Sequence, residues 1–543
     1  MCRLPPRFIL RRATAAVLAS TALATAVGWS QPAPALLAPA VATPTSAATQ
    51  PLKFAVTFPA SARATPVSGR VLLFLSRDPV EPRLAGGFYH LDPVYAIDVK
   101  NLAPGTAVTF APDVFDAPDA LASPGPLRRL ASGAWRAQAV IDLDQTARDL
   151  NQGPGNLYSR PLVCELHGDL GGTFTLTADQ VVAPRGPADT DWVKLVEIRS
   201  RLLSDFHHRD VMLRAAVVLP STYVTQPEAK FPVYYSVPGF GGTHTTAWNW
   251  IRSARGQAWQ RGAVPLQMLQ VFLDADVPLG HSVFANSANN GPAGDALVRE
   301  LIPEIERRFR AIAEPGARFV GGHSSGGWAS LWLQVAYPDD FGGCWSTSPD
   351  PVDFRAFQTS DLYTDKNGYF YPDGTPHPLA RQRGAVVMTY PEMGRWERVL
   401  GHGQQLGSFD ASFSPRGPDG RPLQVMDQLT GAISAKVVEA WKPYDIRLVL
   451  QTNWPKLGPK LQGKLHVLMG DTDTFYLTHA TELLRSFLVT TDFGGYVEIV
   501  PGDHGTAITP SLRDRIDAEM AAKFAEFRRA AFHSAAATAP LRP

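Results

Sequence analysis

Cysteine is scarce in this sequence: only Cys2, Cys164 and Cys344 occur among 543 residues. Cys2 lies in the amino-terminal leader, and no lipobox-like run precedes it, so a lipid-anchored cysteine is not expected. The other two cysteines fall in different predicted regions, and sequence alone cannot bring their side chains within bonding distance. We therefore expect two separate buried thiols rather than a disulfide framework.

An excess of one charge is also absent. The chain has 51 Lys and Arg against 50 Asp and Glu, a formal net charge of +1. This balance offers no basic surplus for a nucleic-acid partner and no acidic tail. No apolar run reaches the roughly 20 residues that a membrane-spanning helix needs, so we expect no stable membrane insertion of the mature chain.

The first 48 residues differ in kind from the rest. A cationic start, MCRLPPRFILRR, precedes a run of small apolar residues and then a Pro/Ala/Ser-rich stretch with several A-x-A sites. This order is typical of a secretory signal peptide followed by a flexible lead-in. An uncleaved anchor is the alternative, but the apolar run is short. We therefore expect cleavage and a secreted or periplasmic location.

Two regions with different patterns follow the leader, as the chain length suggests. Residues 51–190 contain short β-rich runs between Pro, Gly and Asp loops, which is typical of a β-sandwich-like accessory domain. Residues 195–535 alternate β-runs with helical stretches, as in a mostly parallel sheet covered by helices. This second region is interrupted by an insertion at 349–444, rich in Gly, Pro and aromatic residues. An irregular excursion of that length predicts a functional cap over the site or a mobile segment. The predicted β-runs of the second region are 213–220, 233–239, 269–276, 318–322, 343–349, 465–471 and 496–503.

The stretch FVGGHSSGGWASLWLQVAYP, residues 319–338, contains a G-x-S-x-G pentapeptide centred on Ser324. A β-run enters it, and the apolar residues after it recur at helical spacing. A nucleophile elbow requires this context, because the serine occupies a strained strand-to-helix turn and the glycines remove side chains that would clash there. An ordinary Gly-rich turn is the alternative, but the context favours Ser324 as a nucleophile.

A serine nucleophile needs a histidine base and a carboxylate that orients the histidine. Along α/β-hydrolase chains the serine comes first, the acid second and the histidine third. Of the histidines after Ser324, only His504 follows a β-run and begins a loop, in VEIVPGDHGTA. The preceding β-run ends in LHVLMGDTDTF, where Asp473 is the predicted acid and Asp471 the alternative. Asp503, the immediate neighbour of the histidine, is expected to point away. The Asp-x-Asp pair has a second interpretation as a turn cap or a cation site.

The oxyanion of an acyl-transfer reaction needs backbone donors. The loop SVPGFGGTH, residues 236–244, follows an earlier β-run and resembles the His-Gly-x-Gly type of loop, with Pro238 in place of the histidine. The predicted donors are the N–H groups of Phe240, with Gly241 as alternative, and Ser325. A Gly-rich loop that serves only as a turn is the other interpretation.

With these motifs assembled, residues 195–530 resemble the putative esterase family of α/β-hydrolases. That family includes esterase D, feruloyl and acetylxylan esterases, enterochelin esterases and mycolyltransferases. The matching stretches are VVLPSTY, FPVYYSVPGFGG, NSANNGPAGDALVRELIPEIERRFR, GGHSSGGWASLWLQVAYPDDFGG, GDTDTFY and PGDHG. The resemblance implies an acyl-ester hydrolase or acyltransferase with Ser324, Asp473 and His504 as its triad. Pro238 and the long insertion depart from the family pattern, and the β-rich region lies outside the match.

The sequence therefore predicts a secreted serine esterase that needs no metal or organic cofactor and acts on a small-molecule or carbohydrate-linked ester. Three alternatives stay open: acyl transfer to a sugar or lipid alcohol, peptide hydrolysis, and an inactive binding protein on the same scaffold. Loss of a triad residue would mark the last, and none is lost. Aromatic residues of the insertion could stack on a substrate or form the core of a cap: Tyr363, Phe370, Tyr371, Tyr390 and Trp396.

Overall fold

A computed structural model describes residues 40–41, 50–85, 90–144, 146–184 and 186–538. The predicted signal peptide and lead-in, residues 1–48, lie outside these ranges apart from the pair Ala40–Val41. Within the described ranges, no helix combines the length and the apolar character required to cross a membrane. Cys164 and Cys344 are both buried and unpaired, as predicted.

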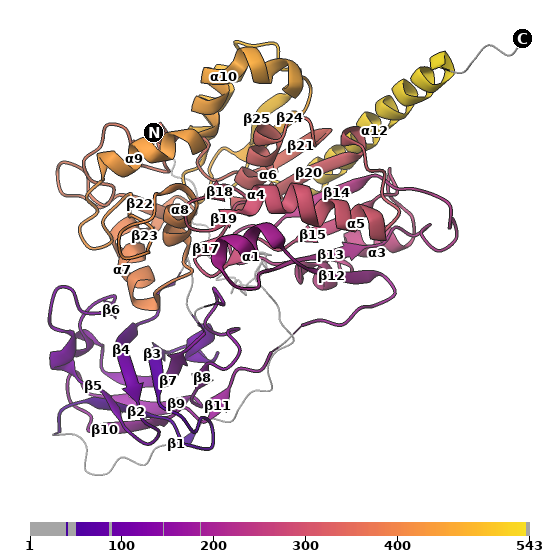
Figure 1. The fold of residues 1–543 in the computed structure, drawn as a ribbon. Coiled ribbons are helices and arrows are strands. Elements are labelled where there is room, and N and C mark those ends of the chain that lie inside the picture. Colours follow the sequence, from indigo (N-terminus) through magenta and orange to yellow (C-terminus); the bar gives the residue numbers. More distant parts are fainter. Residues whose placement is uncertain (1–39, 42–49, 86–89, 145, 185, 539–543) are drawn as a thin grey trace, which may run out of the picture. The chain divides into compact units, whose positions relative to one another are not determined.

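The amino-terminal strands form two sheets (Figure 1). An eight-stranded sheet has the order β1-β9-β7-β3-β4-β6, with β8 beside β7 and β11 beside β8, and a three-stranded sheet has the order β10-β2-β5. Alternating side chains of both sheets, such as Phe54 and Phe110 from one and Val71 and Ile141 from the other, pack into one apolar core. The strands are β1 Ala40–Val41, β2 Lys53–Thr57, β3 Val67–Ser76, β4 Val94–Leu102, β5 Val108–Phe110, β6 Ala122–Ser123, β7 Gly133–Asp142, β8 Leu157–Tyr158, β9 Leu162–Leu166, β10 Thr173–Thr177 and β11 Gln180–Val181. The 3₁₀ turns are η1 Pro82–Leu84, η2 Pro112–Phe115 and η3 Leu127–Arg129.

The second region is built on an eight-stranded sheet in the order β12-β13-β15-β14-β20-β21-β24-β25. β12 and β15 both run antiparallel to β13, and each later neighbour pair, from β15 and β14 to β24 and β25, is parallel. The carboxyl ends of β14, β20, β21, β24 and β25 therefore meet at one edge. The strands are β12 Val193–Arg199, β13 Met212–Val218, β14 Val233–Val237, β15 Leu269–Leu273, β20 Arg318–His323, β21 Gly343–Thr347, β24 Leu465–Gly470 and β25 Tyr496–Val500.

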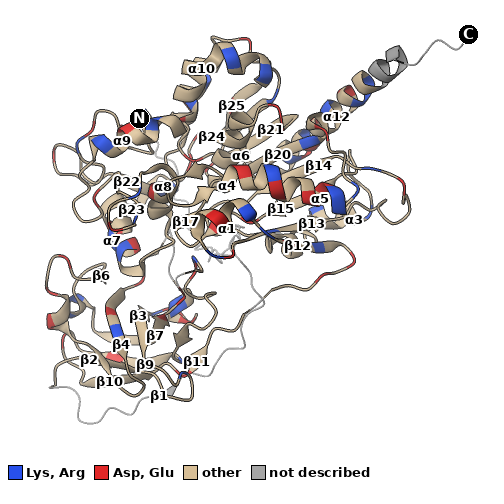
Figure 2. Cartoon of the chain, viewed as in Figure 1, with Lys and Arg blue, Asp and Glu red and all other residues tan. Residues whose placement is uncertain are grey.

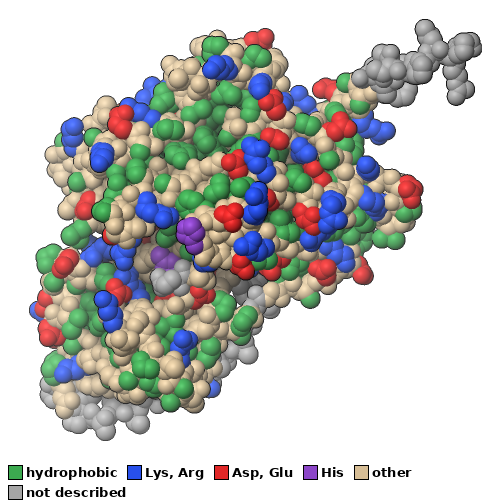
Figure 3. All heavy atoms as spheres, in the orientation of Figure 1, with side chains coloured by type: hydrophobic (Ala, Val, Ile, Leu, Met, Phe, Trp, Pro, Cys, Tyr) green, Lys and Arg blue, Asp and Glu red, His purple; other side chains and the backbone are tan. Residues whose placement is uncertain are grey.

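Helices cover both faces of this sheet. Alternate residues of β13 show the two faces: Ala215 and Val217 join the larger core, while Ala216 and Val218 join the smaller one. The larger core includes residues of α1 Arg201–His207, α4 Ala293–Ala296, the π-turn η4 Leu297–Leu301, α5 Ile302–Arg308, α6 Ser325–Ala336, α10 Ile446–Leu461 and α11 Thr478–Leu488. The smaller core includes residues of α2 Thr246–Trp250, α3 Ala254–Gln260 and α12 Pro510–Thr538. Figure 2 shows basic and acidic residues interspersed along the chain, and Figure 3 shows their side chains intermingled on the face in view.

The insertion between β21 and α10 carries structure of its own. Its elements are η6 Phe354–Ala356, β22 Pro378–Gln382, β23 Ala385–Thr389, α7 Tyr390–Leu400, α8 Gln405–Phe413, α9 Ala435–Trp441 and η7 Lys442–Tyr444. The remaining short elements are β16 Asp276–Val277, β17 Gly280–His281, β18 Asn286–Ser287, β19 Gly291–Pro292 and η5 Pro315–Ala317. Val399 and Leu400 of α7 share a buried cluster with Leu72, Phe74 and Val140 of the β-rich strands. The described residues all belong to one compact unit, and the boundaries predicted at 51–190 and 195–535 stay predictions.

Each β-run predicted for the second region overlaps a strand of the sheet. The longest strands that the predicted β-runs do not cover are β4 and β12, and shorter strands such as β6, β8, β22 and β23 are not covered either. Polar residues interrupt the apolar ones in both, and only Val193 and Val196 of β12 are fully buried. Such edge and half-exposed strands give a weak apolar signal.

Candidate active site

Ser324 occupies the sharp turn between strand β20 and helix α6. Its backbone lies at φ 61° and ψ −127°, a conformation that residues with a side chain rarely adopt. The N–H of Ser324 donates to the carbonyl oxygen of Thr347 on β21 at 3.1 Å, which holds the turn in place. The strand and the helix predicted on either side of this serine are both present.

Gly322 and Gly326 make this turn sterically possible. A Cβ atom at Gly322 would stand 2.4 Å from the carbonyl oxygen of Gly326, and one at Gly326 would stand 2.2 Å from the carbonyl oxygen of Val237. Backbone atoms cannot approach a Cβ so closely, so neither position tolerates a side chain. The G-x-S-x-G spacing thus follows from how tightly β14, β20 and α6 pack.

His504 and Asp473 lie in the loops after the neighbouring parallel strands β25 and β24. Nδ1 of His504 and Oδ2 of Asp473 are 2.7 Å apart. Asp473 is fully buried, and its other oxygen accepts the N–H of Phe475 at 2.8 Å. This geometry fixes the carboxylate and directs one imidazole nitrogen to it, so the opposite nitrogen, Nε2, faces away from Asp473.

The charges around His504 favour its protonated form. Burial lowers the pKa of His504, but the charge and hydrogen bond of Asp473 outweigh it, assisted by Asp350 and Asp503, and the pKa is raised. The imidazole also lies against the His323 ring, with centroids 4.6 Å apart. Burial and the His504 charge lower the pKa of His323 to about 3, so His323 stays neutral.

Asp350 brings a second carboxylate to Ser324. It follows β21 and is 4% exposed. Its Oδ2 accepts the hydroxyl of Ser325 at 2.5 Å, and its N–H donates to the carbonyl oxygen of Ser324 at 3.3 Å. Burial raises the pKa of Asp350 to about 6, opposed by hydrogen bonds from the hydroxyls of Ser325 and Ser324 and by the His504 charge. The sequence prediction missed this residue, although its position at the carboxyl end of a parallel strand is a signal that a scan of all strand ends would have found.

The loop after β14 lies beside the Ser324 turn. A Cβ atom at Gly239 would stand 3.2 Å from the carbonyl oxygen of His323 and 3.5 Å from Cβ of Ser324. The loop closes on itself through a hydrogen bond from Gly242 N–H to the Gly239 carbonyl at 2.9 Å. Phe240 therefore sits in a tight turn next to the serine.

The carbonyl before this turn is held by a buried histidine. His281 Nε2 lies 2.9 Å from the carbonyl oxygen of Pro238, while its Nδ1 accepts the N–H of Val283 at 3.0 Å. Burial lowers the pKa of His281 to about 4, so the ring is neutral and donates from Nε2. Ser325, the other predicted donor, is the first residue of α6, and N–H groups of the first helical turn have no acceptor within the helix.

A small cavity adjoins Ser324, and the insertion supplies much of its wall. The volume is about 20 Å³, which exceeds the roughly 10–15 Å³ that one water needs on such a measure. Phe475, whose ring lies 4.9 Å from the His504 ring, forms part of the same wall. The insertion contributes Gln358, Leu379, Met393, Gln405, Leu406 and Phe409.

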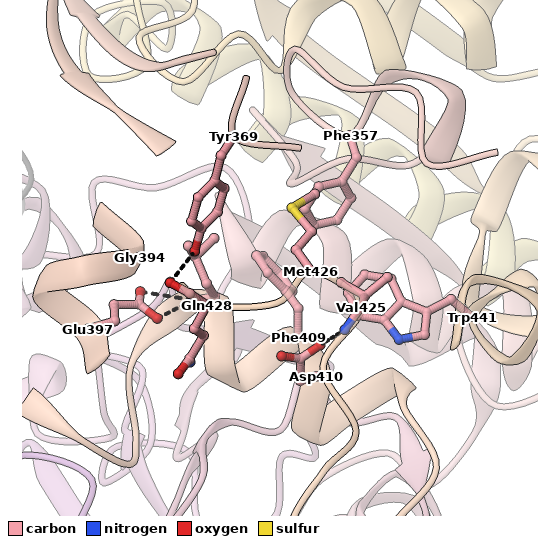
Figure 4. Close-up of a pocket in the computed structure, with 11 residues that line it drawn as sticks. Phe357, Tyr369, Gly394, Glu397, Phe409, Asp410, Val425, Met426, Gln428 and Trp441 are labelled. Atoms are coloured by element: carbon pink, nitrogen blue, oxygen red, sulfur yellow. Dashed lines mark hydrogen bonds between the residues drawn. The ribbon is translucent and has the colours of Figure 1, made fainter. Parts of the chain in front are cut away.

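Leu406 and Phe409 also line a second cavity of about 30 Å³ deeper in the insertion. Figure 4 shows its aromatic wall, with Tyr369, Phe357 and Trp441 around Met426. The carboxylates of Glu397 and Asp410 are buried here and already accept backbone N–H groups, from Leu406 at 2.9 Å and from Val425 at 2.8 Å. These carboxylates therefore have structural partners.

Other candidate residues have structural roles. His466 lies on β24, stacks on Trp345 with centroids 4.6 Å apart and belongs to the interior. Asp471 accepts the N–H of Gly502 at 2.9 Å and joins the loops that carry Asp473 and His504. Asp503 accepts N–H groups of Gly505 and Thr506 and caps the loop that follows it.

The insertion aromatics divide into two groups. Tyr390 is fully buried, and Tyr363 and Trp396 pack against the larger core. Phe370 and Tyr371 are each 38% exposed. Among the described residues, one group with metal-ligand side chains, Asp78, His90 and Asp92, belongs to the β-rich region and not to this pocket.

Comparison with known proteins gives one family. The family model described as "Putative esterase" matches residues 210–481, half of the chain. No curated protein matches the chain. Similar solved structures include a ferulic acid esterase (13% identity, 61% of this chain and 99% of that chain, TM-score 0.41). Two S-formylglutathione hydrolases are also similar. The one from Staphylococcus aureus has 15% identity, covers 61% of this chain and 99% of its own, and gives a TM-score of 0.36. The one from Agrobacterium tumefaciens has 14% identity, covers 62% of this chain and 98% of its own, and gives a TM-score of 0.37.

The family match spans the strand before the glycine-rich loop, the Ser324 elbow, the insertion and Asp473, and it ends before His504. The sheet order and the helix layers agree with the α/β-hydrolase fold that was expected. The chain belongs to the putative esterase family and is a carboxylic ester hydrolase.

Proposed function

We propose that the protein is a secreted serine esterase in which Ser324 is the nucleophile, His504 the general base and Asp473 the residue that orients the histidine. The N–H groups of Phe240 and Ser325 stabilise the oxyanion. The observation that carries the proposal is the 2.7 Å contact between His504 Nδ1 and the buried Asp473 carboxylate, in the loops beside a strained serine turn. A structural ion pair alone would not require the strained serine.

The reaction proceeds through an acyl-enzyme. When substrate binds, the hydroxyl of Ser324 turns from Asp350 to Nε2 of His504, since catalytic hydrogen bonds often form only in the substrate complex. Ser324 Oγ attacks the ester carbonyl while His504 takes the proton, and Asp473 stabilises the imidazolium. The imidazolium then protonates the leaving alcohol, and water attacks the acyl-enzyme in the same way, with His504 as base. The acyl–oxygen bond to Ser324 then breaks, the carboxylic acid leaves, and His504 gives the proton taken from water to Ser324. The serine's own proton has left with the alcohol, so the cycle closes without a cofactor.

The dimensions of the pocket favour a short acyl group. The cavity of about 20 Å³ beside Ser324 ends at Leu406 and Phe409. This space is little larger than one water needs, so each further carbon of an acyl chain requires these side chains to shift. The alcohol part then extends toward the outside, which is compatible with a small-molecule or carbohydrate-linked alcohol.

Export and the accessory region complete the proposal. The cationic, apolar and A-x-A order of residues 1–48 supports export through a cleaved signal peptide. The two sheets of the β-rich region enclose one apolar core, which supports a sandwich-like accessory domain. Amino-terminal sequencing of the protein recovered from the periplasm or medium tests the cleavage.

The nucleophile is tested with p-nitrophenyl esters of increasing acyl length and with a fluorophosphonate probe. Mature wild type should turn over the acetyl ester and become labelled. Ser324→Ala should lose at least two to three orders of magnitude in kcat and all labelling, because the covalent step is lost.

Ser330→Ala is the matched control, because Ser330 lies on the same helix, is buried and donates its hydroxyl to the Gly327 carbonyl at 2.9 Å. Its activity should stay within about threefold of wild type, since it touches no reacting atom. Equal activity of wild type and Ser324→Ala would contradict the proposal.

A further inference from the structure

Arg148 reaches the glycine-rich loop from the β-rich region of the chain. It lies between β7 and β8, and its guanidinium carbon stands 4.9 Å from the centre of the Phe240 ring. One of its terminal nitrogens lies 3.8 Å from where a Cβ of Gly241 would stand. The side chain is only 10% exposed, so this is an interior contact and not a surface arginine near the site by chance.

The arginine is itself held in place. Its Nε donates to Oδ1 of Asp276 at 3.1 Å. The carbonyl oxygen of Ala147, the preceding residue, lies 3.0 Å from Nε2 of His402 in the insertion. A Cβ at Gly403 would stand 2.7 Å from Cγ of Arg148, so the insertion backbone packs directly against it. Arg148 is therefore fixed by Asp276 on one side and by the insertion on the other.

The loop that it touches is rich in glycine. Phe240 lies between Gly239 and Gly241, and Gly242 follows, so no neighbouring side chain in the loop limits the backbone conformation at Phe240. His281 holds the Pro238 carbonyl at the start of the loop. Phe240 carries the one large side chain between Gly239 and Gly242, and its ring is the surface through which a neighbour can fix the direction of its N–H.

We propose that Arg148 is a positioning residue for the oxyanion hole: by packing on the Phe240 ring, it orients the N–H of Phe240 toward the developing oxyanion. The β-rich region thus contributes to catalysis through one side chain. This inference rests on the proposed function, because it assigns Phe240 as an oxyanion donor.

The test is a double-mutant cycle with Arg148→Ala and Phe240→Leu, measured with p-nitrophenyl acetate. Phe240→Leu keeps the backbone N–H but removes the aromatic ring. Loss of a whole oxyanion donor costs about 10²–10³-fold in kcat, so a misdirected donor should cost roughly 10- to 100-fold. Arg148→Ala should lower kcat by that amount and leave KM within about threefold. Because both changes remove the same contact, their effects should not multiply. The kcat of the double variant should lie within about threefold of the kcat of the slower single variant.

Arg77→Ala is the matched control. Arg77 belongs to the same β-rich region and stacks on Trp135 at 4.4 Å, far along the chain from the loop. Arg77→Ala should lose about as much thermal stability as Arg148→Ala, while its kcat stays within about threefold of wild type. Arg148→Lys should lie between Arg148→Ala and wild type, because an ammonium keeps the charge opposite Asp276 but offers no plane to stack on the ring.

Three results would overturn the inference: an unchanged kcat in Arg148→Ala, independent losses that multiply in the double variant, or a loss confined to the KM of negatively charged esters. Ser324→Ala, run beside these variants, separates this failure from that of the proposed function. An inactive Ser324→Ala with a normal Arg148→Ala rejects only the role of Arg148, whereas an active Ser324→Ala rejects the serine mechanism itself.

Discussion

Asp350 and Asp473 both place a carboxylate near the His504 imidazole, and their surroundings assign them different roles. Asp473 contacts the ring directly at 2.7 Å. Asp350 instead accepts the hydroxyl of Ser325, the residue whose N–H is a proposed oxyanion donor. Its charge acts on His504 from the side of Ser324, and the charge of Asp503 acts from the exposed loop. Asp350 therefore influences both the position of the α6 amino terminus and the basicity of His504.

Asp350→Asn should shift the acidic limb of the kcat/KM profile to lower pH. The base acts when His504 is neutral, so activity rises as the pH passes the pKa of His504 from below. The charge of Asp350 helps to raise that pKa, and its removal lowers it. Asparagine keeps an oxygen that can accept the Ser325 hydroxyl. The measurement is kcat/KM against pH from 4 to 9 for wild type and variant, in the assay used for Ser324→Ala.

Asp503→Asn provides the comparison, because Asp503 also faces His504 but lies in an exposed loop where solvent screens its charge. The acidic limb of the kcat/KM profile should move to lower pH in Asp503→Asn as well, but by less than in Asp350→Asn. An acidic limb that stays in place or moves to higher pH in Asp350→Asn would show that Asp350 does not act on the base.

Helix α8 separates the two cavities of the insertion, so it sets how far an acyl chain can extend. Leu406 and Phe409 face both cavities. The buried carboxylate of Glu397 accepts the N–H groups of Leu406 and Gly407 in the first turn of α8, at 2.9 and 3.2 Å, which fixes this helix at its amino terminus. The position of one helix therefore limits the acyl pocket.

Phe409→Val should widen the choice of acyl group. Removal of most of the ring joins the cavity beside Ser324 with the one behind it, which makes room for a longer acyl chain. The ratio of kcat/KM for the hexanoyl p-nitrophenyl ester to kcat/KM for the acetyl ester should therefore rise at least about tenfold. Tenfold is the lower end of the discrimination that one methylene produces in an apolar pocket. Phe413→Val is the control on the same helix. Phe413 packs on Trp328 and Trp441 and lines neither cavity, so that ratio should not change. An equal rise in both variants would mean that general loosening, and not the joined cavity, admits the longer chain.

The elements of the catalytic sheet could be predicted because most of them are buried on both faces. Strand β24 is buried along its whole length, and β20 is buried at its centre. Both end at turns or loops that bear the candidate site residues, and that pattern is readable in sequence. Strand β12 could not be predicted this way, because it lies at the edge of the sheet and only Val193 and Val196 are buried, one on each face. The same reasoning applies to the site: Ser324, Asp473 and His504 stand in motifs, but the positions of Asp350, His281 and Arg148 depend on which distant segments pack together.

At the scale of the whole molecule, the β-rich strands and the insertion share a buried cluster that includes Leu72, Val140 and Leu400. Arg70 adds hydrogen bonds to the carbonyl oxygens of Arg398 and Val399 at 2.9 and 3.0 Å. Residues 147–148 reach the glycine-rich loop beside this same contact. The cluster therefore supports the position of Arg148 as well as the stability of the chain.

Leu400→Ala should affect both properties. Truncation of a buried leucine costs about 2–5 kcal/mol of the free energy of unfolding. Because the cluster also holds residues 147–148 against the insertion, kcat for p-nitrophenyl acetate should fall about three- to tenfold at a temperature well below the unfolding transition, less than for direct removal of the arginine. The measurements are thermal unfolding by calorimetry and kcat on the same preparation.

Leu166→Ala distinguishes this coupling from instability alone. Leu166 on β9 is fully buried within the core of the β-rich strands and does not belong to the shared cluster. It should lose a similar free energy of unfolding and keep its kcat, since the contacts around Ala147 and Arg148 are untouched. Equal kcat losses in the two variants would mean that activity follows global stability, whereas a loss restricted to Leu400→Ala would mean that the packing of the β-rich region on the insertion supports the catalytic geometry.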